Sequence, residues 1–440
     1  MAVPGAARAA VIVRGGWVVT ARGVDRADIA ITDGRITAVG QDLAADGEEI
    51  NASGLHIFPG GIDSHVHFNE PGRTEWETIA DGSAALAAGG YTTFVDMPLN
   101  CRPVTVAGGP FDLKLQAATR SSRVDFGLWG GLVPGNLDHI EELVGRGVIG
   151  FKAFMCASGI EEFPACNKHV LREGMHRIAA LGSTLLLHAE DQEIVERQAH
   201  KVHGNGARDF VRSRPPEAEV DAIFRAIELG AETGCRLHIV HVSTVVGAEL
   251  VREAQERGVD ISAETCPHYL LYVEEDLERL GGVGKCAPPF RTAHDRDGLW
   301  HMLSEGTLPM VVSDHSPSTL ELKRGQDFFH MWGGVSGCQS TRQLLLAQGR
   351  LDESRIAAIT ATNIAQRFGL AGKGDIAPGF DADLWIADLS HHDLVRREDL
   401  FYRNQFSAHE GQRIRGRTVR TLVRGEDPGR GRFIRGGARS

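Results

Sequence analysis

Two histidines two residues apart are the first residues in this sequence that suggest chemistry. His65 and His67 lie in the run 59–72, which begins as a short apolar strand and ends in a loop rich in glycine and proline. Residues i and i+2 of a strand point to the same face, so the two imidazoles would project side by side. This arrangement suits a pair of metal ligands. The alternative is that one or both histidines only satisfy hydrogen bonds in a core or at a strand end.

Residues with metal-binding chemistry recur where other apolar runs end. Taken singly, each could be a core histidine, a solvated lysine or a capping aspartate. Together they occupy the ends of several predicted strands in a consistent frame, which favours one shared site. The residues are Lys152, His188, His241 and Asp314.

A lysine can join a metal site only after chemical conversion, because an ammonium group has no lone pair. Lys152 follows an apolar run, where burial would lower its pKa and leave a neutral amine able to add carbon dioxide. The resulting carbamate is anionic and offers two oxygens, enough to bridge two cations. The alternative interpretation of Lys152 is an ion pair with Asp96 or Glu190.

The segments that must position these residues alternate between strands and helices from residue 60 onward. Helix-like segments include 74–88, 136–145, 169–181, 217–233 and 245–257. Eight strands, each followed by a helix or a long loop, favour an α/β fold of the (β/α)₈ TIM-barrel type, in which the carboxyl ends of the strands converge on one mouth. The predicted strands are 62–68, 91–97, 124–130, 148–154, 184–189, 236–242, 259–265 and 308–313.

The two ends of the chain have β character of a different kind. Residues 8–58 alternate short β-branched runs with tight turns, among them Asp33-Gly34, a hairpin signal. After helical stretches at 339–348 and 354–368, β character returns at 374–386 and 417–424. We expect one small β-sandwich domain built from both termini. The expected division is 1–58 and 371–425 for that domain, 59–370 for the barrel, and 426–440 for a mobile tail.

Composition excludes several classes of protein. The chain has 440 residues, and its 47 basic and 58 acidic residues give a net charge of −11, which disfavours a nucleic-acid partner through repulsion. The seven cysteines are scattered and form no Cys-X-X-Cys pair, as is typical of reduced thiols in a cytoplasmic protein. No apolar run is long enough to predict a signal peptide or a membrane span. We therefore expect a cytoplasmic protein that binds neither membrane nor nucleic acid.

The set of strand-end residues resembles the binuclear site of the amidohydrolase superfamily, in its cyclic-amidase branch of dihydroorotases, hydantoinases and allantoinases. The resemblance spans nearly the whole chain, including the stretch 376–383. It implies two divalent metal ions per subunit, zinc in the first place with cobalt or manganese as alternatives, and a homo-oligomer, specifically a tetramer. The implied ligands are His65 and His67 for the more buried metal, His188 and His241 for the more exposed one, Lys152 as a bridging N6-carboxylysine, and Asp314 completing the first site.

The residues that follow the first histidine pair resemble those of allantoinases. Dihydroorotases typically carry an arginine two residues beyond the second histidine, where it binds the substrate's carboxylate, and this sequence has Asn69 there. A neutral amide suits an uncharged ureide better than a carboxylate. The stretches 65–77, 96–100 and 313–317 are similar to allantoinases as well.

This resemblance implies metal-dependent hydrolysis of the cyclic amide of allantoin to allantoate, a step of purine catabolism. Asp314 would be the catalytic residue that moves the proton. The implied substrate contacts are Asn69, Asn100, Ala287, Ser316 and Gly333. Two alternatives stay open: a hydantoinase, dihydropyrimidinase or dihydroorotase-like enzyme, and an inactive scaffold homologue. The run 70–73 argues against the first, and the six filled ligand positions argue against the second.

Overall fold

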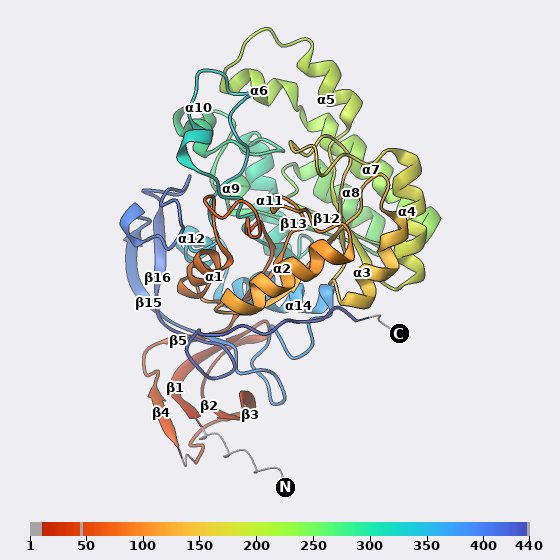
Figure 1. Cartoon of the computed structure of the whole chain (residues 1–440). Coiled ribbons are helices and arrows are strands. Elements are labelled where there is room, and N and C mark those ends of the chain that lie inside the picture. Colours follow the sequence, from red (N-terminus) through yellow and green to blue (C-terminus); the bar gives the residue numbers. More distant parts are fainter. Residues whose placement is uncertain (1–10, 45–46, 438–440) are drawn as a thin grey trace.

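The computed structural model describes residues 11–44 and 47–437 of the chain (Figure 1). One of its sheets combines strands from both ends of the chain, in the order β16-β15-β5-β1-β2-β3, with β4 paired to β1. The link between the two ends is β5, which pairs in parallel with β1 and antiparallel with β15. The strands are β1 (Val11–Thr20), β2 (Gly23–Thr32), β3 (Arg35–Gly40), β4 (Glu48–Asn51), β5 (His56–Pro59), β15 (Leu384–Leu394) and β16 (Arg413–Leu422).

The predicted hairpin joins β2 and β3 in this sheet. Its two turn residues, Asp33 and Gly34, have φ angles of 52° and 76°. A two-residue hairpin of this kind needs positive φ at both central positions, which Asp-Gly supplies at little cost. A separate apolar cluster, containing Val13, Ile29 and Ile386, lies among the residues of this sheet.

The middle of the chain forms two parallel sheets, ordered β6-β7-β8 and β14-β13-β12-β11-β10-β9. Each of the eight predicted apolar runs contains a strand, so the prediction of alternating strands and helices is confirmed. The strands of the two sheets are β6 (Gly61–Val66), β7 (Tyr91–Asp96), β8 (Asp125–Leu128), β9 (Gly130–Gly131), β10 (Phe151–Phe154), β11 (Thr184–His188), β12 (Arg236–Ile239), β13 (Ile261–Thr265) and β14 (Met310–Val311), and the predicted run 124–130 reaches both β8 and β9.

Main-chain contacts connect the two parallel sheets along both of their edges. Near β8 and β10, the amide of Ile149 donates to Leu128 O at 2.9 Å. Beyond β14, His315 forms a parallel bridge with Val66 of β6, and the amide of His67 donates to His315 O at 2.8 Å. The carboxyl ends of the parallel strands therefore open onto the same side of the molecule.

Helices follow the parallel strands and begin where polar side chains cap them. Thr78, Asn167 and Thr244 each accept a hydrogen bond from a backbone amide in the first turn that follows. The first predicted helix begins at residue 79 instead of 74, because Thr78 caps it. The helices are α1 (Ile79–Ala88), α2 (Gly108–Ser121), α3 (Ile140–Arg146), α4 (Lys168–Ala180), α5 (Gln192–Ala199), α6 (Ala207–Ser213), α7 (Pro216–Thr233), α8 (Val245–Glu256), α9 (Pro267–Leu271), α10 (Asp276–Leu280), α11 (Ala293–Glu305), α12 (Thr341–Gln348), α13 (Glu353–Ala357) and α14 (Asn363–Phe368).

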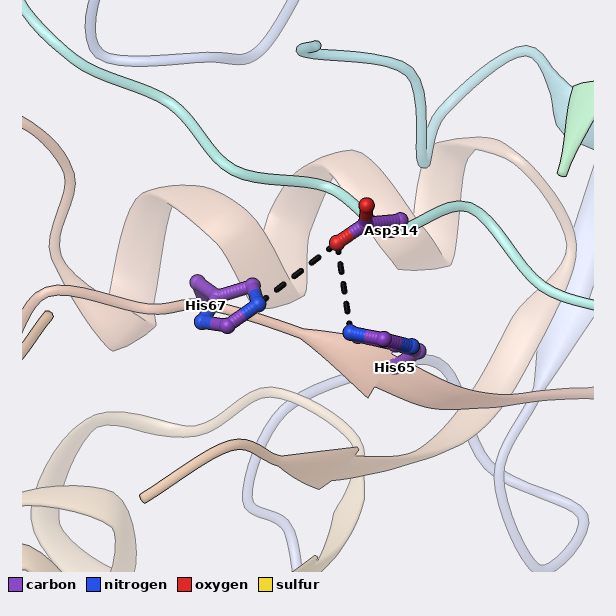
Figure 2. A group of neighbouring side chains, drawn as sticks. All are labelled: His65, His67 and Asp314. Atoms are coloured by element: carbon purple, nitrogen blue, oxygen red, sulfur yellow. Dashed lines mark ion pairs between the residues drawn. The ribbon is translucent and has the colours of Figure 1, made fainter. Parts of the chain in front are cut away.

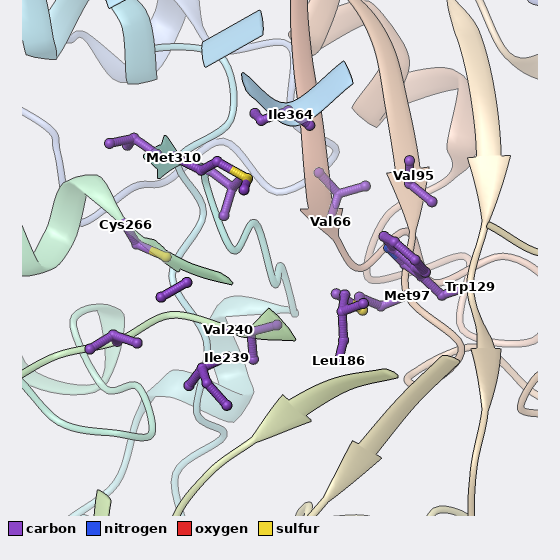
Figure 3. Close-up of a cluster of buried hydrophobic side chains, with 14 of the residues drawn as sticks. Val66, Val95, Met97, Trp129, Leu186, Ile239, Val240, Cys266, Met310 and Ile364 are labelled. Carbon is purple, nitrogen blue, oxygen red and sulfur yellow. The ribbon is translucent and has the colours of Figure 1, made fainter. Parts of the chain in front are cut away.

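None of the helices in the described ranges combines the length and the apolar character needed to cross a bilayer. The large apolar cluster contains residues of the parallel strands and of the helices that follow them. Figure 3 shows part of it, with Val66, Leu186 and Ile239 contributed by three different strands. Trp129 also belongs to this cluster, and its indole N–H donates to Ser64 O at 2.9 Å. The core thus fixes the strand that carries the first histidine pair.

The last described residues return to the parallel strands and end beside α3 (Figure 1). Main-chain hydrogen bonds run from Gly431 to Ser122, from Ile434 to Phe126 and from Gly436 to Gly147. A Cβ at Gly431 or Gly436 would meet a backbone carbonyl, so these glycines permit a close approach. Residues 431–436 of the expected mobile tail are thus hydrogen-bonded to the parallel strands and the segments beside them, and residues 438–440 lie outside the described ranges.

Candidate active site

A cavity of about 550 Å³ lies at the carboxyl ends of the parallel strands. His65 lies in β6, and His67 directly follows it. Lys152 lies in β10 and His188 ends β11, whereas His241 and Asp314 lie in the segments after β12 and β14. All six residues predicted as metal ligands line this one cavity: His65, His67, Lys152, His188, His241 and Asp314. The prediction that these strand ends meet is confirmed.

The first group in the cavity consists of His65, His67 and Asp314 (Figure 2). The Asp314 Oδ1 atom lies 3.2 Å from Nε2 of His65 and 3.5 Å from Nε2 of His67. All three side chains are buried. Asp314 has a φ of 45°, a left-handed conformation that aspartate tolerates better than most residues and that turns its carboxylate toward the histidines.

The second group consists of His188 and His241. Nδ1 of His188 lies 3.0 Å from Nε2 of His241. Two ring nitrogens at this distance satisfy each other only if one carries a proton, whereas two lone pairs so placed suit a shared cation. His241 has a φ of 41°. Its ring centroid lies 5.4 Å from that of His65, so the two groups adjoin.

Lys152 is fully buried between these groups, and its Nζ atom has no hydrogen-bond partner among the described residues. Burial lowers its pKa to about 7, although the charges of Asp314 and Glu264 oppose the shift. A substantial fraction of the side chain is therefore a neutral amine near neutral pH. Such an amine is the form that carbamylation requires.

The alternative ion pairs for Lys152 are not formed. Asp96 lies 3.0 Å from the ammonium group of Lys114 instead. Glu190 accepts hydrogen bonds from the Arg214 guanidinium, with Nη2 at 2.7 Å from Oε2. Both carboxylates are thus committed elsewhere, and the ion-pair interpretation of Lys152 is wrong.

Two buried carboxylates hold the histidine rings from behind, and sequence reasoning did not assign them this role. Glu264 Oε1 lies 2.6 Å from Nδ1 of His65, and Glu190 Oε2 lies 2.7 Å from Nε2 of His188. A ring N–H held by a carboxylate leaves the opposite nitrogen free to bind a metal. The sequence could have indicated the role of Glu190, because it lies two residues after His188. It could not have indicated the pairing of His65 with Glu264, because these two residues are 199 positions apart.

Four of the five predicted substrate contacts line the cavity, namely Asn100, Ala287, Ser316 and Gly333. The fifth, Asn69, does not: its side chain is fully buried, and its amide group donates to Pro317 O at 3.3 Å. Asn69 is therefore bound to the segment that follows Ser316 and does not line the cavity. Residues 157–159, in the segment after β10, also border the cavity.

The donor set fits divalent transition metals. Four imidazoles and a carboxylate are ligands that zinc and related ions prefer. Nζ of Lys152 is buried without a hydrogen-bond partner in the described part of the chain. Buried polar atoms are normally paired. This unpaired nitrogen therefore agrees with a site that is completed by carbamylation and by cations.

Comparisons with known proteins place this geometry in a family. The sequence model of the Amidohydrolase family matches residues 56–419. A protein from Rubrobacter xylanophilus named Allantoinase is 51% identical over 441 residues, covering 96% of this chain and 97% of that protein. Another Allantoinase, from Solibacter usitatus, is 49% identical and covers 94% of this chain and 92% of its own length.

Solved structures agree in fold. L-Hydantoinase (dihydropyrimidinase) from Arthrobacter aurescens superposes with a TM-score of 0.93 at 33% identity, covering 97% of this chain and 99% of that one. Dihydropyrimidinase from Brevibacillus agri NCHU1002 gives a TM-score of 0.90 at 28% identity, covering 98% and 99%. On its sequence, its fold and its cavity, the chain belongs to the amidohydrolase family.

Proposed function

We propose that this protein is an allantoinase, a cyclic amidohydrolase that opens the five-membered ring of allantoin to give allantoate. The observation that carries the proposal is the convergence of six ligand-type side chains on one cavity, in a chain that is 39–51% identical to proteins named Allantoinase. The identity extends over at least 94% of the chain in each of these relatives.

The metal site follows from the family and from the donor atoms. Amidohydrolases are metal-dependent, and we assign one cation to the group around His65, His67 and Asp314 and a second to His188 and His241. Cations held there would lower the pKa of a water molecule and polarise the ring carbonyl. Zinc is the metal that we propose, with cobalt or manganese as alternatives.

Lys152 is proposed to bridge the two groups as N6-carboxylysine. Its buried, unpartnered Nζ would attack carbon dioxide, form an N–C bond and release one proton. The product carries a negative charge where the neutral amine carried none. This charge would add to that of Asp314 in a cavity whose other proposed ligands are histidine rings.

Asp314 is proposed as the residue that moves the proton. Its carboxylate lies at the cavity surface, 8% exposed, whereas Glu264 is fully buried behind His65. Asp314 can therefore reach a water molecule in the cavity, accept its proton and deliver it to the departing ring nitrogen. Glu264 and Glu190 keep the rings of His65 and His188 in fixed orientations during this transfer.

A hydantoinase is the second candidate, favoured by the solved structures at 33% identity or below. The Allantoinase relatives are more similar over the same span. The cavity presents neutral polar groups from Asn100 and Ser316, whose side chains lie 3.4 Å apart. Neutral donors and acceptors suit the uncharged ureido group of allantoin.

Finer features of the fold belong to the same proposal. We infer that the two parallel sheets close into one (β/α)₈ barrel over 59–370, and that the sheet from both termini is a small β domain. The links at both sheet edges support closure.

A cytoplasmic location is supported by seven cysteines that are all buried and free. Assembly into a homo-oligomer, specifically a tetramer, remains a proposal from family resemblance.

The test is a substrate panel combined with metal analysis. Protein purified without chelator should contain two divalent ions per chain and should hydrolyse allantoin with a higher kcat/KM than hydantoin, dihydrouracil or dihydroorotate. A preference for hydantoin or dihydrouracil would establish the second candidate instead. Metal-loaded protein that hydrolyses none of the four would be an inactive scaffold.

A further inference from the structure

One wall of the cavity is a short segment without regular secondary structure. Residues 329–334 border the cavity, and we call them the wall segment. Trp332 packs edge-to-face on Trp76, with ring centroids 4.7 Å apart. Gly334 has a φ of 138°, and a Cβ there would lie 2.5 Å from Ser316 O. The wall segment therefore lies directly against Ser316, two residues beyond Asp314.

Lys323 holds the end of the wall segment. It ends a short 3₁₀ helix, η3 (Leu320–Lys323), and is 4% exposed. Its Nζ donates to Trp332 O at 3.0 Å and to Gly334 O. In return, the amide of Trp332 donates to Leu322 O at 2.8 Å. Side-chain and main-chain hydrogen bonds thus both hold Trp332, and a side-chain hydrogen bond also holds Gly334.

Lys285 holds the beginning of the wall segment from the opposite side. Its Nζ donates to Phe329 O at 3.1 Å and to Met331 O at 2.5 Å. The same ammonium lies 4.8 Å from the ring centroid of Phe210, a cation–π contact. The main-chain carbonyl of Lys285 accepts a hydrogen bond from Gly334 N at 2.7 Å.

Both lysines lack the partner that a buried ammonium usually has. No carboxylate within residues 11–44 and 47–437 forms an ion pair with Lys285 or Lys323, and all four of their hydrogen bonds go to carbonyls of the wall segment. Burial lowers the pKa of Lys323 to about 7 and that of Lys285 to about 8. Burying a polar group without a hydrogen-bond partner is costly, and the carbonyls of the wall segment are the partners that offset this cost for both lysines.

We propose that Lys285 and Lys323 are positioning residues that hold the wall segment against the cavity and thereby determine which ring substituents fit. The inference rests on the proposed function, because the substituent in question is the one on carbon 5 of a hydantoin ring. The wall segment carries no ligand of the candidate metal groups. Loosening it should therefore change substrate fit more than the chemistry at Asp314.

The test compares Lys323→Met and Lys285→Met with the wild type. Methionine keeps the unbranched stem of the side chain as far as Cε and removes the terminal nitrogen, with its charge and its donors. A matched control is Ile29→Ala, which removes buried volume in the sheet built from both termini and leaves the wall segment untouched. Lys285 borders the cavity, so water can reach its side chain and the variant Lys285→Met should fold. This variant provides the test if Lys323→Met fails to fold.

Two readouts are needed. The first is the KM and kcat for allantoin and for 5-benzylhydantoin, a ring with a bulkier apolar substituent. We expect KM for allantoin to rise about tenfold, the range that small changes in pocket fit produce, with kcat within about twofold. The ratio of the two kcat/KM values should shift toward 5-benzylhydantoin. The second is hydrogen exchange of the amides of Trp332 and Gly334, which should become faster.

The outcomes separate this inference from the proposed function. Unchanged KM, unchanged substrate ratio and unchanged exchange in folded lysine variants would overturn the inference. An equal change in Ile29→Ala would overturn it as well, because the effect would then follow from lost stability alone. If the wild type hydrolyses no cyclic ureide, the proposed function fails, and the exchange rates still decide whether the lysines hold the wall.

Discussion

Three of the six non-glycine residues with positive φ in the described part of the chain border the cavity. Among the described residues, Asn100, His241 and Asp314 have φ angles of 72°, 41° and 45°, and all three border the cavity. Left-handed backbone costs most side chains about 1 kcal/mol or more, and least for asparagine and aspartate. Backbone strain at these three positions therefore accompanies the orientation of their side chains toward the cavity.

Asp314→Asn tests the proton transfer without adding strain, because asparagine also tolerates positive φ. We expect the variant to fold normally and to keep most of its bound metal. Turnover of allantoin should fall by about 100-fold or more, since an amide cannot accept the proton. Metal analysis and steady-state kinetics measure the two properties separately. A nearly normal kcat would remove Asp314 from the proposed mechanism.

Lys152→Ala tests the carbamate. The substitution removes the bridging charge, so we expect loss of metal and of nearly all activity. Propionate at high concentration should restore part of both, because its carboxylate can occupy the place of the carbamate. Lys201→Ala is the matched control, since Lys201 is exposed. A Lys152→Ala variant that keeps two metals and full activity contradicts the bridge.

At the scale of elements, the strands could be predicted and their mutual contacts could not. Runs such as 184–189 are apolar, short and bounded by polar residues, so their length and their flanking residues located them. The position of Asn69 depends on a contact with Pro317, 248 residues away. The two lysines behind the wall segment likewise bind carbonyls of another segment, and main-chain acceptors leave no trace in a sequence.

Gly333→Ala tests the wall segment as part of the cavity. A Cβ at Gly333 meets no heavy atom within 4 Å, so the methyl group would extend into open space at the cavity. We expect stability to stay within about 0.5 kcal/mol of the wild type. KM should rise more for 5-benzylhydantoin than for allantoin, because the larger ring substituent needs the space. Equal kinetics for both substrates would show that residue 333 does not face the bound ring.

At the scale of the whole molecule, one charge cluster joins three parts of the chain. The ammonium of Lys373 lies 2.6 Å from Asp125 at the start of β8 and 2.7 Å from Asp383, just before β15. Arg424, after β16, pairs with Asp125 as well. The sheet built from both termini is thereby connected to the parallel strands. Composition could not predict this cluster, because its members are up to 299 residues apart.

The pKa values within this cluster fix its dependence on pH. Burial alone would lower the pKa of Lys373, but the charges of Asp383 and Asp125 outweigh it and raise the pKa above the ordinary 10.5. Because the pKa of Lys373 is higher in the folded protein than its ordinary value, its ammonium stabilises the folded protein fully below about pH 10, and this stabilisation is lost only at higher pH. Lys373 is therefore charged and stabilising throughout the neutral range.

Lys373→Met should destabilise the protein by roughly 3 kcal/mol at pH 7, because Asp125 and Asp383 keep their buried charges without this ammonium. In the variant, burial would raise the folded-state pKa of these carboxyls, so the folded protein takes up protons as the pH falls. The deficit in the free energy of unfolding should then narrow from pH 8 to pH 5. Urea unfolding across this range measures it, with Lys201→Met as an exposed control. A deficit that stays constant or widens toward acid would show that the carboxylates do not depend on Lys373, and that other contacts connect the two parts of the molecule.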